Sequence, residues 1–282
     1  MRRVSTGIVS AVFVALFLAL ATVPSSAADN NAYNLPWEKF SIQAGAFFAG
    51  LNNQVTVGSP GAGVAIDVEQ TLGLNVHSTV FRAGAAYRIG SERRHRLDLD
   101  YLYFNRSGDK TIGQDIEVDN TVIAAGTRVE TTYNFQILRL SYSYSFFQDD
   151  RMDLGASFGF FVMPIKFSIS ASGLGSGQGE LKFTAPLPAL GLRGDFAITP
   201  RWFLRTNVDF FYLEYQAFTG YLVDTRIAVE YNPWKHFGFG LGLDNFRMQL
   251  KRDGSTNYPG ANFEGEVKNQ FFGAQLYARY FF

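Results

Sequence analysis

Apolar and more polar residues alternate along the last sixteen positions of the chain, 267–282. One set, which includes Leu276, Tyr280 and Phe282, is apolar or aromatic, and the intervening set, which includes Arg279, is more polar. Because the side chains of a strand point alternately to opposite faces, this pattern predicts a strand with one face in lipid and the other toward a wetter interior. The alternative is a soluble edge strand that ends in Phe.

The same alternation recurs in several other segments. Leu and Tyr alternate with Asp over 97–103, Leu, Tyr and Phe with Arg and Ser over 138–146, and Phe and Leu with Gly and Asp over 237–244. A fourth segment, 153–160, sets Leu, Ala and Phe against Asp, Gly and Ser. The strands expected around these segments exceed the roughly 9–11 residues needed to cross a bilayer. The pattern predicts an all-β, antiparallel, up-and-down transmembrane β-barrel.

Four short polar turns divide the pattern, at 91–94, 148–151, 199–200 and 232–235. Outer-membrane barrels place short turns in the periplasm and long loops outside, and with both termini periplasmic the strand count is even. Placing these four turns in the periplasm gives a consistent arrangement of ten strands. Upward strands are expected at about 38–57, 95–117, 152–172, 201–216 and 236–251, and downward strands at about 79–90, 129–147, 179–198, 220–232 and 265–282. External connections follow at about 58–78, 118–128, 173–178, 217–219 and 252–264.

Two segments leave the strand count open. Pro186 and Pro188 fall inside an expected strand, where proline removes donors from the hydrogen-bond ladder. They are expected at a bulge or above the membrane. The segment 61–74 contains Ile66-Asp67-Val68-Glu69 and fits a short extra strand or a helix. Eight or twelve strands are therefore the alternatives to ten.

The first residues form a secretory signal peptide. Arg2 and Arg3 precede an almost wholly apolar stretch, 8–23, and small residues follow at 25–28. We expect cleavage after Ala27 or Ala28, which leaves 1–28 as the signal peptide and 29–282 as the barrel. A retained membrane anchor is the alternative, but the apolar stretch is slightly short for a span.

Composition agrees with export and with a lipid-facing wall. The chain has 28 Phe, 14 Tyr and 3 Trp, and it has no Cys. A closed ladder of backbone hydrogen bonds stabilises a membrane barrel without disulfides. The 25 basic and 25 acidic residues balance, so composition gives no argument for a nucleic-acid partner. No cofactor motif is present, and no His or Cys pair has metal-ligand spacing.

The inward positions of the expected strands carry both signs of charge. Such charges must be paired or hydrated, because an isolated buried charge is too costly. We interpret them as a salt-bridge network that plugs the lumen; a narrow polar pore is the alternative, although an ion-selective pore would favour one sign. The expected members are Arg82, Arg88, Asp98, Asp100, Arg139, Asp153, Arg193, Asp195, Arg205, Asp209, Asp224, Arg226, Glu230, Asp244 and Arg279.

Most of the expected mature chain resembles a recurring group of proteobacterial outer-membrane β-barrel proteins with no assigned activity. The matching segments are 66–74, 80–82, 94–97, 104–108, 138–146 and 185–194. A terminal strand that ends on Phe resembles the assembly signal of these barrels, carried here by Leu276, Tyr280 and Phe282. Gln70-Thr71 departs from the acids that often precede Leu-Gly-Leu in the group.

The resemblance implies an outer-membrane location, with lipids and lipopolysaccharide as surroundings. During biogenesis it implies the barrel-assembly machinery and periplasmic chaperones as partners. The expected protein is a monomer.

The sequence offers few candidates for catalytic residues. Of three His, only His77 falls on the external side, beside Ser78, and a polar loop residue is the simpler interpretation. Ten strands also match the outer-membrane aspartyl proteases called omptins, but Asp98 and Asp100 fall near the periplasmic end and no Asp-x-His occurs. We assign no catalytic residue. Three functions remain: a closed barrel with a structural or surface-interaction role, a narrow channel for small solutes, and a lipid- or lipopolysaccharide-modifying enzyme that uses His77.

Overall fold

The structure, a computed structural model, describes residues 36–57, 66–118, 121–172, 178–215, 218–252 and 265–282. The expected signal peptide, 1–28, and its cleavage site lie outside these residues, as does most of the connection 252–264. Within the described part of the chain, no helix is long and apolar enough to cross a bilayer.

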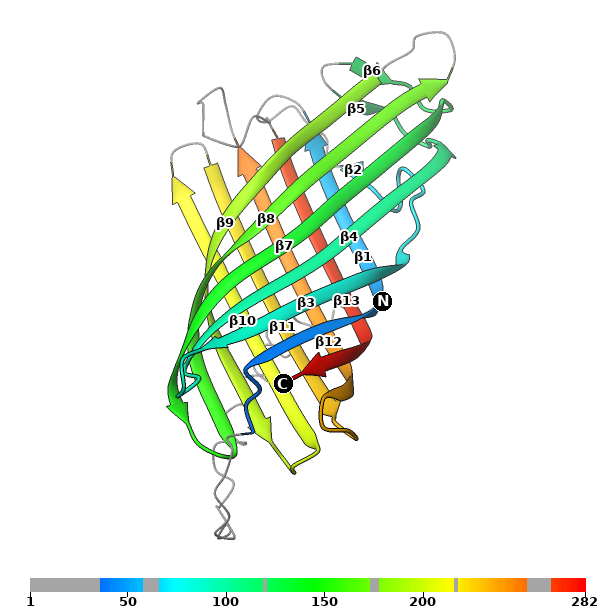
Figure 1. Cartoon of the computed structure of the whole chain (residues 1–282). Coiled ribbons are helices and arrows are strands. Elements are labelled where there is room, and N and C mark those ends of the chain that lie inside the picture. Colours follow the sequence, from blue (N-terminus) through cyan, green and yellow to red (C-terminus); the bar gives the residue numbers. More distant parts are fainter. Residues whose placement is uncertain (1–35, 58–65, 119–120, 173–177, 216–217, 253–264) are drawn as a thin grey trace, which may run out of the picture. The chain divides into compact units, whose positions relative to one another are not determined.

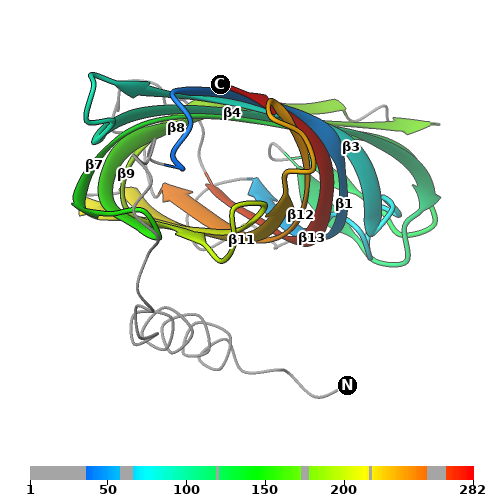
Figure 2. The same ribbon diagram turned by 60° about the horizontal axis from the view of Figure 1, so that its bottom comes forward.

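Ten antiparallel strands form a closed barrel (Figures 1 and 2). Each pairs with the next along the chain, and the first pairs with the last from Ser41↔Phe281 to Val57↔Gly265, so the sheet has no free side edge at this junction. The barrel strands are β1 (Phe40–Val57), β3 (His77–Ile89), β4 (His95–Thr111), β7 (Arg128–Gln148), β8 (Met152–Ser172), β9 (Gln178–Ala197), β10 (Trp202–Tyr215), β11 (Phe218–Tyr231), β12 (Phe237–Arg252) and β13 (Gly265–Phe281).

The predicted fold class is confirmed, with ten strands and not eight or twelve. Most strand bounds fall within two residues of the prediction because alternation persists to the strand ends. The short turns lie at one end of the barrel, together with Phe40 and Phe281, and we call this the turn end. The opposite end, where β7 and β8 meet the longer connections, is the loop end.

The loop end differs from the prediction in two connections. β4 stops at Thr111 and not at 117, and a separate hairpin of β5 (Ile116–Val118) and β6 (Thr121–Ile123) follows it. In the other connection, β2 (Ile66–Asp67) pairs with β1 at Gln54 and Val55. The extra strand considered for this segment therefore exists, but it is too short to add a wall strand.

β9 extends beyond β10, one of its two neighbours, toward the loop end. Its pairing with β10 ends at Leu190↔Phe210, whereas its pairing with β8 continues to Gln178 (Figure 1). Pro186 and Pro188 lie in this extension, paired only with β8. Proline is tolerated on a strand edge because no neighbour needs its missing N–H. The prolines are thus accommodated by an edge and not by a bulge.

The outer face carries large exposed apolar side chains, in the alternation that the sequence shows. Examples on successive strands are Ile42, Phe48, Phe81, Leu97, Leu99, Leu138, Leu140, Phe158, Phe160, Leu190, Leu192, Val208, Phe210, Phe239, Leu241, Phe272 and Leu276. Exposed aromatic residues mark the turn end, among them Tyr87, Tyr144, Trp202, Tyr280 and Phe282. An apolar band with an aromatic border is typical of a lipid-facing wall.

Candidate functional site

The structure places the inward charged residues in the half of the lumen nearer the turn end. Each side chain in this set is at most 18 % exposed, and each forms an ion pair with another member, except Asp98, which pairs with Arg96. The set is Arg82, Arg88, Asp98, Asp100, Arg139, Asp153, Arg193, Asp195, Arg205, Asp209, Asp224, Arg226, Glu230, Asp244 and Arg279. Two clusters can be distinguished along the barrel axis.

The first cluster lies close to the turn end and is centred on Asp153 and Asp195. Arg193 donates to Asp153 and to Asp195, at 3.0 and 2.8 Å. Arg88 reaches across the lumen from β3 to the same two carboxylates, at 3.0 Å to Asp195 and also in contact with Asp153. Arg96 adds a 2.9 Å bond to Asp195. Arginines from the adjacent strands β3 and β4 thus meet Arg193 of β9 at two buried acids.

Glu230 connects the first cluster to the last strand. Arg205 of β10 and Arg279 of β13 both donate to its Oε2, at 2.6 and 2.7 Å, and the hydroxyl of Tyr277 donates to Oε1 at 2.9 Å. Glu38, which precedes β1, bonds the same two arginines. Burial disfavours its charged form, but the attraction of Arg205 and Arg279 outweighs burial and holds the pKa of Glu38 well below its usual range.

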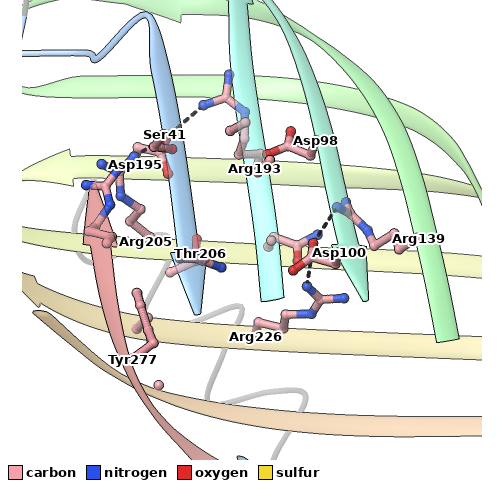
Figure 3. Close-up of a pocket in the computed structure, with 18 of the residues that line it drawn as sticks. Ser41, Asp98, Asp100, Arg139, Arg193, Asp195, Arg205, Thr206, Arg226 and Tyr277 are labelled. Atoms are coloured by element: carbon pink, nitrogen blue, oxygen red, sulfur yellow. Dashed lines mark hydrogen bonds and ion pairs between the residues drawn. The ribbon is translucent and has the colours of Figure 1, made fainter. Parts of the chain in front are cut away.

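The second cluster lies deeper in the barrel, toward its middle. Arg139 of β7 forms two hydrogen bonds with Asp209 of β10, at 2.7 and 3.1 Å, and an ion pair with Asp100 at 3.5 Å. Arg226 pairs with Asp100 at 2.9 Å and with Asp224 at 2.6 Å. Figure 3 shows Arg139 and Arg226 on either side of Asp100.

Arg82 of β3 completes the second cluster by donating to Asp244 of β12 at 2.5 Å.

A small polar cavity lies between the clusters, with a volume of about 130 Å³ (Figure 3). Ser141 and Gln275, both buried, contribute side-chain atoms that have no protein partner. Polar cavities of this kind hold ordered water, which satisfies buried donors and acceptors. The cavity is therefore suited to hydrating the charges, and its arginines and acids are already committed to one another.

The other half of the lumen is mostly apolar, which differs from the wetter interior that the alternation predicts. Phe246 stacks on its register partner Phe271 at 4.8 Å between centroids, and Phe104 stacks on its register partner Phe135 at 4.5 Å. Phe271 also lies 5.5 Å from Phe104, so the rings form one continuous layer. We call Phe47, Phe104, Phe135, Phe161, Phe246 and Phe271 the phenylalanine layer; each is at most 5 % exposed.

Two arginines of the second cluster form the boundary with the phenylalanine layer. The guanidinium of Arg82 lies 5.6 Å from the ring centre of Phe47, and that of Arg139 lies 5.9 Å from the ring centre of Phe161. A guanidinium over an aromatic face is attracted by the ring quadrupole. The charged and apolar halves therefore join through cation–π contacts.

Beyond the layer, the segment that contains β2 packs against β1 and β4. Ile66, Val68 and Leu72 are buried in the apolar core. Glu69 accepts hydrogen bonds from Asn53 of β1 and from Arg106 of β4, the latter at 2.7 Å. This buried pair fixes the segment across the stretch of β4 that has no β3 neighbour.

Four residues that take part in these ion pairs are absent from the predicted set: Arg96, Arg106, Glu69 and Glu38. Arg96 and Arg106 have the same parity as Asp98 and Asp100 on β4, so alternation contained their signal. Glu69 lies outside any long strand, and no periodicity identifies it. Glu38 precedes β1, where the strand pattern has only begun.

The structure gives little support to an enzyme that uses His77. His77 is exposed at the first residue of β3, paired in register with Gly50. The nearby acid Glu69 is committed to Arg106 and Asn53. Asp98 and Asp100 lie in the lumen, paired with arginines, and not at the loop end. Among the described residues, no group of three or more potential ligands is arranged to hold a metal ion.

Solved structures share the fold at low sequence identity. The outer membrane protease OmpT from Escherichia coli aligns with a TM-score of 0.51 and 11% identity, over 90% of this chain and 99% of that one. The outer membrane protein OprG from Pseudomonas aeruginosa aligns with a TM-score of 0.38 and 9% identity, over 88% and 99%. No protein-family model matches the sequence, and no curated protein matches it. The similarity to OmpT concerns the fold.

Proposed function

We propose that this protein is an integral outer-membrane β-barrel with a closed lumen and a structural or surface-interaction role. The observation that carries the proposal is the filling of the lumen at two levels, by paired charges and by the phenylalanine layer. A ten-stranded barrel is only slightly wider than the eight-stranded barrels that side chains fill, and porins use about sixteen strands.

A narrow channel fits this interior less well. Ions must lose hydration to enter an apolar region, and Phe246 and Phe271 are 1 % and 4 % exposed there. The charges nearer the turn end are balanced and committed to each other, so a permeating ion would have to displace a partner.

The outer-membrane location is supported by the apolar outer face, the aromatic border and the fold shared with OmpT. Lipids and lipopolysaccharide would surround this face, and a monomer suffices because the barrel closes on itself. The loop end would then lie outside the cell. There, β7, β8 and β9 continue past the last β9–β10 pair and present the surface on which an external partner would bind.

Solute permeation tests the closed lumen. Liposomes that contain the folded protein should retain small sugars and ions as well as protein-free liposomes do, because no continuous aqueous path crosses the phenylalanine layer. Swelling of the liposomes in an isosmotic sugar solution, at a rate that grows with protein content, would instead favour the channel.

Surface labelling tests the orientation. A peptide tag inserted after Gly113, an exposed residue between β4 and β5, should bind antibody on intact cells. A tag at Asp150, in the turn between β7 and β8, should bind antibody only after the outer membrane is permeabilised. The opposite pattern would reverse the assignment of the two ends.

The C-terminal residue is predicted to matter for assembly. Phe282 is exposed on the outer face and its ring lies 5.3 Å from that of Phe40, next to the β1–β13 junction. Replacing Phe282 by Ser should reduce the amount of folded protein in the outer membrane, measured by fractionation and heat-modifiable migration on gels. The same replacement at Phe237, an outward residue at the start of β12, serves as the control. Equal amounts of the Phe282→Ser variant and the wild type would contradict a terminal assembly signal.

A further inference from the structure

The residues just ahead of the first strand lie across the turn end. Trp37 belongs to no strand, yet it is fully buried. Its Nε1 donates to the backbone oxygen of Asp149 at 2.7 Å, in the turn between β7 and β8. Its ring lies 6.4 Å from that of Phe203 on β10, and the guanidinium of Arg88 from β3 lies 5.7 Å from it. Figure 2 shows this dark blue segment bending away from the wall.

Glu38 extends the same contacts to the last strand. It binds Arg279 of β13 at 2.6 Å and Arg205 of β10 at 3.0 Å, and it lines the polar cavity. Arg93, in the turn after β3, donates to the backbone oxygen of Trp37. Residues 36–39 are therefore attached to β3, β10, β13 and the β7–β8 turn. The contacts of Trp37 and Glu38 are made largely by side chains, so residues 36–38 can leave while Lys39 keeps its backbone bonds to Phe282 and Arg88.

We propose that residues 36–38 form a latch that closes the polar cavity at the turn end, and that its release opens the cavity to water from that end. The opposite end stays closed by the phenylalanine layer, so an open latch gives a blind pocket and not a channel. Release exposes Arg205 and Arg279, each of which keeps Glu230 as a partner. The latch thus controls access to a cationic surface inside the barrel.

Cysteine labelling tests the latch directly, because the sequence has no Cys. Ser157 lines the cavity from β8, and a Ser157→Cys variant of the full chain adds one reactive thiol there. In purified, folded protein, a small, neutral, water-soluble methanethiosulfonate reagent should label this thiol slowly. Adding Trp37→Ala or Glu38→Ala should raise the labelling rate by about tenfold or more, because local opening controls access.

Matched controls separate the latch from general loosening. Lys39→Ala changes the exposed side chain next to the latch, keeps the backbone bonds of that residue and should leave the rate unchanged. A cysteine at Ser91, exposed in the turn after β3, should react quickly in every background. An unchanged rate in folded Trp37→Ala and Glu38→Ala variants would overturn the latch. Ionic current through either variant would contradict the closed phenylalanine layer and leave the latch intact.

If the Trp37→Ala and Glu38→Ala variants fail to fold, the burial of Trp37 can be measured by fluorescence quenching instead. Trp202 and Trp234 are exposed on the barrel, and replacing both with Phe leaves Trp37 as the only fluorophore of its kind. Its emission should resist quenching by acrylamide until the protein unfolds. Quenching equal to that of the unfolded chain would show that Trp37 is not seated in the lumen.

Discussion

Replacing Arg139 by Met should lower the free energy of unfolding by about 3–5 kcal/mol, because it leaves a buried acid without its partner. Asp209, with a side chain only 3 % exposed, would lose both bonds from Arg139 and keep one from Asn207. Met has a similar length, so packing beside Phe161 changes little. Urea unfolding in phospholipid bilayers, followed by tryptophan fluorescence, measures the effect.

The double variant Arg139→Met with Asp209→Leu provides the control. Removing both charges of a buried pair is often neutral or stabilising, whereas removing one is strongly destabilising. The double variant should therefore recover most of the lost stability. If it unfolds more easily than Arg139→Met alone, the interaction between these two residues is not what stabilises this part of the lumen.

Replacing Leu140 by Arg should cost about 2–4 kcal/mol for the opposite reason, because it places a charge against the middle of the lipid layer. Leu140 is 51 % exposed on the outer face, one position from Arg139, and its register partners Leu99 and Phe160 are also exposed there. The same unfolding measurement applies.

Thr132→Arg is the matched control for depth. Thr132 lies on the same face of β7, nearer the loop end and beyond the apolar band. Arg should cost only about 0–1 kcal/mol near or above the interface. Equal costs at Leu140 and Thr132 would mean that Leu140 does not face lipid.

The strands could be predicted from the sequence because two environments impose a period of two on the same residues. On β7, Arg139, Ser141 and Ser143 face the lumen while Leu138 and Leu140 face outward, and any register slip would place charges in lipid. Alternation predicts a strand less well where its outer face contacts lipid and its inner face contacts the phenylalanine layer, because both faces are then apolar. At Phe160 and Phe161 on β8, one ring faces outward and the next faces the phenylalanine layer, so the alternation carries no signal.

The pairing inside the lumen could not be predicted for a different reason. Arg82 and Asp244 lie on β3 and β12, and Arg139 and Asp209 on β7 and β10. Which of them meet depends on the stagger and tilt of the closed barrel, which no single strand encodes. Trp37 lies outside any periodic segment, so its burial depends on contacts that only the closed barrel creates.

Ionic current across a planar lipid bilayer tests the closed lumen most directly. Purified, folded protein is added to the bilayer under an applied voltage, and a known porin in the same bilayer confirms that channels would be detected. We expect a flat baseline, because the phenylalanine layer and the paired charges leave no continuous aqueous path. Discrete current steps from the wild-type protein would contradict it and make the narrow channel the better description.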